Sequence, residues 1–206
     1  MTLSASAHLA AVEVLASGGW PDTGDGELPP PLAGFVVSGF SPMASAAADR
    51  CLEQVLGPLE TLADRAGADG SRTAGPGERT AIVLGSRGGD LETHTATALA
   101  VDAGKPAAPL LFFQSVPNAV VGHIAKRWRL TGPVICFSPD AAKGDALGEA
   151  LDITRTLVAE GDAAEALVLL VEQAGPDGEP ASARALLVRP VPGAGSGTGS
   201  GSGEGS

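Results

Sequence analysis

Short runs of apolar residues alternate along the chain with longer segments in which apolar residues recur every three or four positions. The first pattern predicts buried strands and the second predicts helices. The predicted strands are residues 8–15, 80–86, 134–137, 166–171 and 181–188, and the predicted helices are residues 42–66, 90–102, 117–128 and 140–160. This alternation favours an α/β fold with a mostly parallel sheet covered by helices. The turn before the last strand is short, so that strand should run antiparallel to its neighbour.

Capping and helix-breaking residues refine the limits of the helix at 42–66. Ser41 is a suitable N-terminal cap, and Pro42 suits the first turn. Pro58 lies inside the same apolar pattern and should kink or divide the helix.

The composition changes near the C-terminus. Residues 193–206 are mostly glycine and serine, which bury little apolar area, and they predict a disordered tail. Residues 1–192 would then form one domain of ordinary size. Within that domain, residues 67–78 are rich in glycine, aspartate and serine and predict a mobile loop.

Composition also limits the classes of function. The hydrophobic share is 44% and the aromatic share 3%, so alanine, valine and leucine must build the core. The formal net charge of −11 disfavours nucleic acid as a partner, because phosphate contacts need basic side chains. Apolar runs fall short of the roughly 18 residues that a membrane span needs. The first residues lack the pattern of a signal peptide, so we expect a cytoplasmic protein that does not bind membranes.

Two cysteines are present, Cys51 and Cys136. They lie far apart and form no Cys/His cluster, so we expect neither a metal site nor a cofactor. Cys136 lies in a predicted strand, where it is either a buried small apolar residue or a nucleophile. A disulfide between the two residues stays open, although a cytoplasmic location favours free thiols.

The segment at 113–138 is more specific than the rest of the chain. Its spaced positions are Pro117-Asn118, Gly122, Ile124-Ala125, Arg127, Leu130 and Gly132-Pro133. They resemble the β-ketoacyl synthase pattern PN…G.IA.R..L.GP, in which a helix and a strand deliver the nucleophilic cysteine. Residues 81–86, 91–93 and 163–171 are similar to further segments of that family.

The resemblance covers residues 42–190 loosely and implies one half of the thiolase fold. Such a half has the order βαβαβαββ, with a five-stranded mixed sheet covered by helices. Counted from Gly132-Pro133, the family nucleophile falls at Ala141, which has no reactive group. The family's catalytic histidine pair belongs to the second half of the fold, which the resemblance does not cover.

Short ketosynthase N-terminal-like proteins and the chain-length factors of type II polyketide synthases are the members that the chain resembles most. Chain-length factors have also lost the nucleophile, and they stabilise an active ketosynthase as a heterodimer. They keep both halves of the fold, and here the chain departs from them. The resemblance implies a non-catalytic accessory subunit in polyketide or fatty-acid assembly. Its partner would be a ketosynthase or a second copy of the chain.

The resemblance also implies an interface. Thiolase-fold dimers pair their third strands across a two-fold axis, and the third strand of this chain is predicted at 134–137. The candidate interface residues are Val134, Ile135, Cys136, Phe137 and Asn118.

The alternative function is an enzyme that needs no cysteine. An isomerase or decarboxylase acting on a carrier-bound acyl chain would use Asp140 or His123 as its acid or base. Asp140 is also a suitable cap for the helix at 140–160. His123 lies beside apolar residues on a predicted helix, where a structural role is common.

Lys126, Arg127 and Arg129 form the only basic cluster of this acidic sequence. The dipole of a helix favours cations at its C-terminal end, so a solvated helix end accounts for them. The resemblance adds a second explanation, which is contact with an acidic acyl carrier protein or with its phosphopantetheine phosphate.

The helix at 140–160 carries a polar stripe and should end just before Gly161. The stripe consists of Asp145, Glu149, Asp152 and Thr156. In a complete two-half fold this helix lies between two sheets and should be apolar all round. The stripe therefore favours a short protein with one half only.

Overall fold

The fold is known from a computed structural model, which describes residues 9–26, 28–59, 77, 79–105, 109–142, 144–174 and 178–191. The elements within these ranges are β1 (Val12–Trp20), α2 (Phe40–Leu56), β2 (Thr80–Gly85), α4 (Leu91–Asp102), α5 (Pro109–Gln114), α6 (Asn118–Trp128), β3 (Val134–Phe137), α7 (Ala146–Ala159), β4 (Glu165–Glu172) and β5 (Ser182–Pro190). The expected tail at 193–206, most of the loop at 67–78 and the second part of the helix at 42–66 lie outside the described residues.

The strands form one five-stranded mixed sheet in the order β1-β5-β4-β2-β3. β2 pairs in parallel with β3 and β4, whereas β5 runs antiparallel to β4 and to β1. The predicted α/β class, the mixed sheet and the antiparallel last strand are confirmed.

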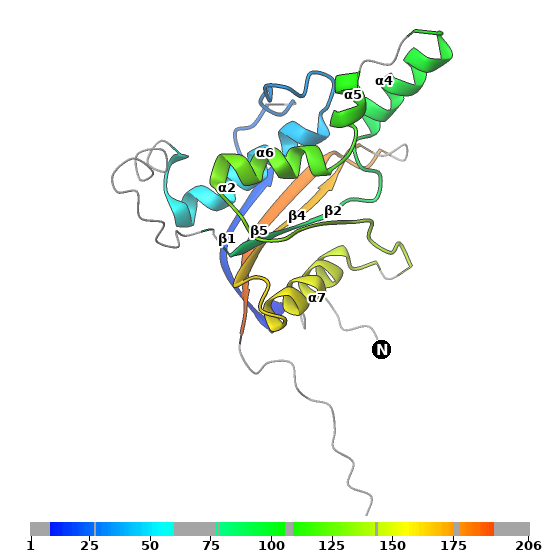
Figure 1. The fold of residues 1–206 in the computed structure, drawn as a ribbon. Coiled ribbons are helices and arrows are strands. Elements are labelled where there is room, and N and C mark those ends of the chain that lie inside the picture. The colour runs from blue at the N-terminus through cyan, green and yellow to red at the C-terminus, as the bar shows by residue number, and fades with distance from the viewer. Residues whose placement is uncertain are drawn as a thin grey trace, which may run out of the picture.

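Helices cover both faces of this sheet (Figure 1). α2 and α6 lie over one face and α7 lies over the other. Along β2 the side chains alternate between the two cores: Ile82 and Leu84 point toward α2 and α6, and Ala81 and Val83 point toward α7. Every residue of β2 is buried, as expected for a parallel strand covered on both sides.

β1 is longer at its C-terminal end than the sequence predicts. The expected strand ended at residue 15, whereas β1 continues to Trp20, and His8 lies outside the described residues. The sequence Ser17-Gly18-Gly19 has the composition of a turn, which explains the error.

Gly18 is required because α2 crosses β1 closely at this point. A Cβ atom built on Gly18 would lie 2.5 Å from the carbonyl oxygen of Ala47 and 2.7 Å from the backbone nitrogen of Cys51. Both contacts are with backbone atoms, which cannot move aside as a flexible side chain would. The core is poor in aromatic residues. The helix and the sheet can therefore approach each other closely where the residues between them are small.

The predicted cap of α2 is wrong. The helix begins at Phe40, and its N-cap residue is Gly39, without a side-chain hydrogen bond. Ser41 lies in the first turn, and its N–H donates to Ser38 Oγ at 2.9 Å. At the other end the helix stops at Leu56.

Gly57, with a φ of +78°, follows α2 and precedes Pro58. The apolar pattern that began at residue 42 is therefore interrupted one residue before the expected proline.

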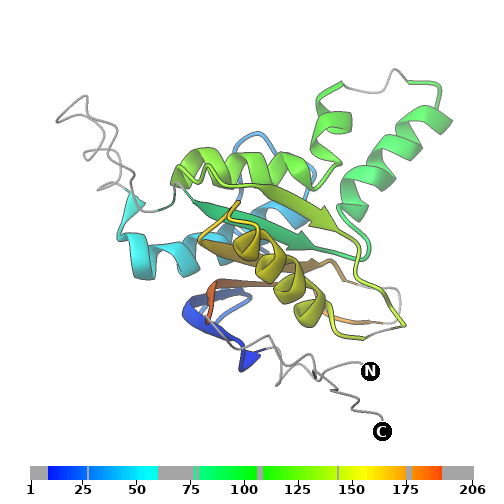
Figure 2. The ribbon, with the colours of Figure 1, turned by 60° about the horizontal axis from the view of Figure 1, so that its bottom comes forward.

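α4 and α5 project from the body of the protein (Figures 1 and 2). The sequence predicts α4 but not α5, and neither helix covers the sheet. In α4 only Thr93 is buried, and the helix packs mainly against α5. We call α4 and α5 together the arm.

Within the described ranges, none of the helices combines the length and the apolar character that crossing a membrane requires.

Substitution of Gly18 should destabilise the protein strongly. We expect Gly18→Ala to lower the free energy of unfolding by about 1–3 kcal/mol, because its Cβ overlaps the backbone of α2. Gly19→Ala is the matched control, since its Cβ would lie 3.5 Å from the Ala183 carbonyl oxygen, an ordinary contact. Urea unfolding measures both values, and equal losses for the two variants would contradict this account of the packing.

Candidate functional site

The loop between β3 and α7 lies where the resemblance expects a nucleophile. Asp140, Ala141 and Ala142 are all exposed in this loop. The Asp140 N–H donates to Glu149 Oε1 at 3.1 Å, and Asp140 Oδ1 accepts from the Ala142 N–H at 2.9 Å. A methyl group at Ala141 cannot form the thioester that condensation needs.

The prediction that α7 begins at Asp140 is wrong. α7 begins at Ala146, and Asp145 caps it by accepting from the Gly148 N–H at 2.8 Å. Gly144, with a φ of +66°, separates the loop from the helix. Asp140 and Asp145 are both suitable caps by residue type, and the positive φ between them decides which one is used.

The far end of α7 matches the prediction, since Gly161 follows the helix with a φ of +82°. Two of the four residues of the polar stripe, Asp152 and Thr156, are exposed, whereas Asp145 and Glu149 are half-buried. Asp152 pairs with Arg155 on the same helix. α7 is thus amphipathic, with its apolar side on the sheet.

His123 belongs to the helical layer formed by α2 and α6. It is half-buried on α6, where its ring meets the edge of the Phe35 ring at a centroid distance of 6.0 Å. Burial, followed by the charge of Arg127, lowers the pKa of His123 below its usual value of 6.5. α6 and α7 cover opposite faces of the sheet, and the bond from Asp140 to Glu149 ties Asp140 to the α7 side, so the structure does not bring His123 and Asp140 together.

β3 is an edge strand and not the buried strand that the sequence predicts. Val134 is 45% exposed, and Ile135, Cys136 and Phe137 are half-buried. The apolar composition suggested burial, but β3 has a neighbour on one side only. Cys136 Sγ lies 2.9 Å from Oδ1 of Asn118, the exposed first residue of α6. The five candidate interface residues therefore lie at one edge of the sheet.

The basic cluster at the end of α6 is partly used inside the protein. Arg127 Nε lies 3.2 Å from Asp49 Oδ1, and the same oxygen accepts from Trp128 Nε1 at 2.6 Å. Lys126 and Arg129 are exposed. Asp49 belongs to α2, far away in the sequence, so no local pattern could have indicated that it engages Arg127.

Both cysteines are free thiols. Cys51 is fully buried, and burial raises its pKa to about 11. Burial also raises the pKa of Cys136. Among the described residues, no group of three or more His, Cys, Asp or Glu side chains could hold a metal ion.

Solved structures share this fold, although no family model and no curated protein matches the sequence. A chain of the ketosynthase ApeO in complex with its chain length factor ApeC, from Xenorhabdus doucetiae, matches with a TM-score of 0.58 and 18% identity. The ishigamide ketosynthase/chain length factor matches with a TM-score of 0.52 and 22% identity. A β-ketoacyl synthase from Burkholderia phymatum STM815 matches with a TM-score of 0.53 and 18% identity.

These matches cover 89%, 82% and 90% of this chain. They cover 80% of the Xenorhabdus chain, but only 46% and 54% of the other two, or about half of their length. The likeness establishes the fold alone: the chain has the fold of one half of the thiolase fold, as these ketosynthase structures do. The prediction drawn from residues 113–138 is confirmed at this level.

The low pKa of His123 makes stability depend on pH. An unfolded chain would protonate this histidine first as the pH falls, so its contribution is complete above pH 6.5 and is lost below that value. We expect His123→Gln to flatten the fall of the unfolding free energy between about pH 7 and pH 5. Urea unfolding at several pH values measures this, and identical pH profiles for the two proteins would contradict it.

The two cysteines should differ in reactivity. At about pH 8 we expect iodoacetamide to modify Cys136 in the folded protein and Cys51 only after unfolding, because a buried thiol with a high pKa is inert. Mass spectrometry of the peptides measures both rates. Cys136→Ser should leave the folded protein unmodified, and equal rates at the two sites would contradict the described burial.

Proposed function

We propose that this protein is a non-catalytic subunit that pairs with an active ketosynthase through β3. The observation that carries the proposal is the open edge of β3, within a fold that it shares with ketosynthase and chain length factor structures. The process would be type II polyketide or fatty-acid assembly.

The backbone of β3 is arranged to receive another strand. The Pro133 carbonyl group accepts a hydrogen bond from Ile82 of β2, and the Phe137 carbonyl group accepts one from Ser86, the residue after β2. Bonding to a neighbour alternates along a strand, so the N–H and C=O groups of Val134 and Cys136 point away from β2. An edge with such groups and no charged side chain is a template for strand pairing.

The opposite edge of the sheet is protected in a way that β3 is not. β1 has a register shift between Val14 and Ala16 and carries the charged side chain of Glu13. Bulges and charges on an edge strand discourage pairing with another chain. This contrast supports β3 as the pairing edge.

The candidate catalytic residues support a non-catalytic role. Ala141 has no nucleophile, His123 lies on α6, and Asp140 is bonded to Glu149 of α7, so the two titratable candidates belong to opposite faces of the sheet. The alternative enzyme, an isomerase or decarboxylase, could therefore use Asp140 or His123 as its acid or base but not the two together at one substrate.

The partner is inferred from the similar structures. Two of the matching structures are described as ketosynthase and chain length factor assemblies, and another as an acyl-carrier protein in complex with its ketosynthase. We therefore place a ketosynthase at β3. Lys126 and Arg129 would be the residues that contact an acidic carrier protein, since Arg127 is paired with Asp49.

Purification of the tagged protein from its native host tests the proposal. We expect native mass spectrometry to show a complex with a ketosynthase at a defined stoichiometry. Recovery of a homodimer without any ketosynthase would contradict it.

Substitutions at Cys136 test the role of the strand. Cys136→Pro removes the outward N–H but no hydrogen bond to β2, and proline is tolerated at such edge positions. We expect this variant to fold and to bind the ketosynthase at least tenfold more weakly, whereas Cys136→Ala should bind normally. Equal affinities for the two variants would contradict pairing through β3.

A further inference from the structure

We propose that His123 is an acid-sensitive latch, which holds the loop at residues 28–38 against α6 and releases this loop when the imidazole ring is protonated. The inference goes beyond the proposed function and does not depend on a ketosynthase partner, because it concerns a change within a single chain.

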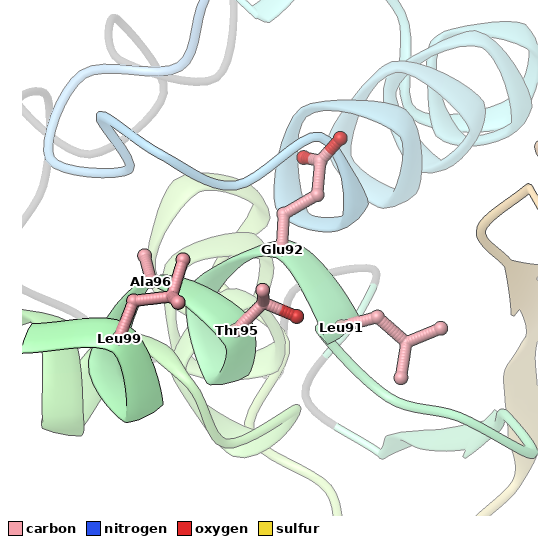
Figure 3. A pocket seen from close by; sticks show the side chains of 5 residues that line it. All are labelled: Leu91, Glu92, Thr95, Ala96 and Leu99. Carbon is pink, nitrogen blue, oxygen red and sulfur yellow. The ribbon is translucent and has the colours of Figure 1, made fainter. Parts of the chain in front are cut away.

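The loop at residues 28–38 is fixed to the body of the protein on both sides. Before the loop, Arg50 of α2 pairs with Asp25, and its Nη1 atom donates to Asp25 Oδ2 at 2.7 Å. After the loop, the Gly39 N–H donates to the Glu92 carboxylate, and Figure 3 shows Glu92 directed toward the start of α2. These two anchors confine a local change of conformation to the loop between them.

Between the anchors, the loop is held to α6 by the contact of two rings. The Phe35 ring meets the edge of the His123 ring at a centroid distance of 6.0 Å. Leu32 and Phe35 are partly buried against the core that α2 and α6 share. The Phe35 N–H donates to the Leu32 carbonyl oxygen at 3.0 Å and closes a turn within the loop. Phe35 is thus the residue through which His123 acts on the loop.

The rest of the loop makes few contacts that would keep it in place. Val36 is 84% exposed and Leu28 is 83% exposed, more than any other large apolar side chain among the described residues. Residues 28–38 include no charged side chain, so no ion pair holds the loop to α6. Segments with few buried apolar contacts open locally at a low cost in free energy. Loss of the contact at Phe35 would therefore suffice to shift the loop.

The surroundings of His123 accept the neutral ring and oppose the charged one. Its Nε2 atom is buried and has no hydrogen-bond partner among the described residues, whereas both N–H groups of an imidazolium need acceptors. Arg127 and Lys126 of α6 repel a positive charge on the ring. Asp49 of α2 favours that charge, but its Oδ1 atom already bonds to Arg127 and Trp128. Burial, followed by the charge of Arg127, accordingly lowers the pKa of His123.

Release of the loop removes this conflict, because water then reaches the ring and hydrates the imidazolium. With the loop open, His123 would titrate near its usual pKa of 6.5, and with the loop closed it titrates lower. The closed loop is therefore favoured fully above pH 6.5. Below that value the ratio of open to closed loop rises by up to about tenfold per pH unit, until the pH reaches the pKa of the closed form. Opening exposes Leu32, Phe35 and the part of α6 beneath them.

Amide hydrogen exchange of the full chain, followed by NMR between about pH 7.5 and about pH 5, tests the latch. Protection factors remove the intrinsic dependence of exchange on pH. The Phe35 amide reports on the loop, and the Ser41 amide, which donates to Ser38 Oγ at 2.9 Å, reports on the start of α2. We expect the protection of Phe35 to fall by at least about threefold over this range, while that of Ser41 changes little.

Two variants assign the effect to one histidine. His123→Phe keeps an aromatic ring beside Phe35 but cannot be charged, so the protection of the Phe35 amide should no longer depend on pH. His123→Gln cannot be charged either and should show the same independence of pH. His94→Gln is the matched control, because the recorded hydrogen bond of that ring is with the Ser115 carbonyl oxygen and not with the loop. It should keep the full response of the unchanged chain.

Three results would overturn the inference. The first is an equal response to pH in the unchanged chain and in both variants at His123. The second is a parallel loss of protection at Phe35 and Ser41, which would mean that the helix opens with the loop. The third is a Phe35 amide that is unprotected at every pH, which would mean that the contact with His123 does not hold the loop.

Discussion

Burial of the central strands between two helical layers is the constraint on which the rest of the structure depends. β2 and β4 are apolar on both faces, so the sheet needs helices on each side. α2 and α6 satisfy one face and α7 the other, and Gly18 allows α2 to approach closely. Once these layers are in place, β1 and β3 are left as the edges of the sheet.

The two edge strands differ in regularity, charge and exposure. β1 is interrupted by a register shift and carries charge, whereas β3 is regular, apolar and half-exposed. The arm stands at the end of the sheet where β3 terminates. Exposed apolar side chains and the outward backbone groups of β3 therefore gather in one region. This distribution supports the proposed pairing with another protein.

The sequence predicts the order of elements and the class of fold well, because apolar periodicity reports which faces are covered. The predictions are wrong where one local sequence pattern is compatible with two structures. Val134–Phe137 is apolar, and apolar runs occur both in buried strands and at interfaces. Asp140 and Asp145 are both suitable caps, and only the backbone at Gly144 distinguishes them.

Contacts between distant residues are the other source of error. The pairing of Asp49 with Arg127 joins α2 to α6, and nothing near either residue indicates it. The sequence does not indicate that the arm is exposed either, because the side chains of Phe112 and Phe113 would suit a buried core equally well. The bounds of the strand Val134–Phe137 follow from the local apolar run and agree with the structure, whereas its exposure and the pairing of Arg127 depend on tertiary contacts that the sequence does not indicate.

Amide hydrogen exchange along β3, with and without the ketosynthase, tests the central claim most directly. The amides of Ile135 and Phe137 face β2 and serve as internal references, while those of Val134 and Cys136 face outward. The account predicts that the two outward amides become protected in the complex. A complex that forms while these amides exchange as fast as before would contradict it.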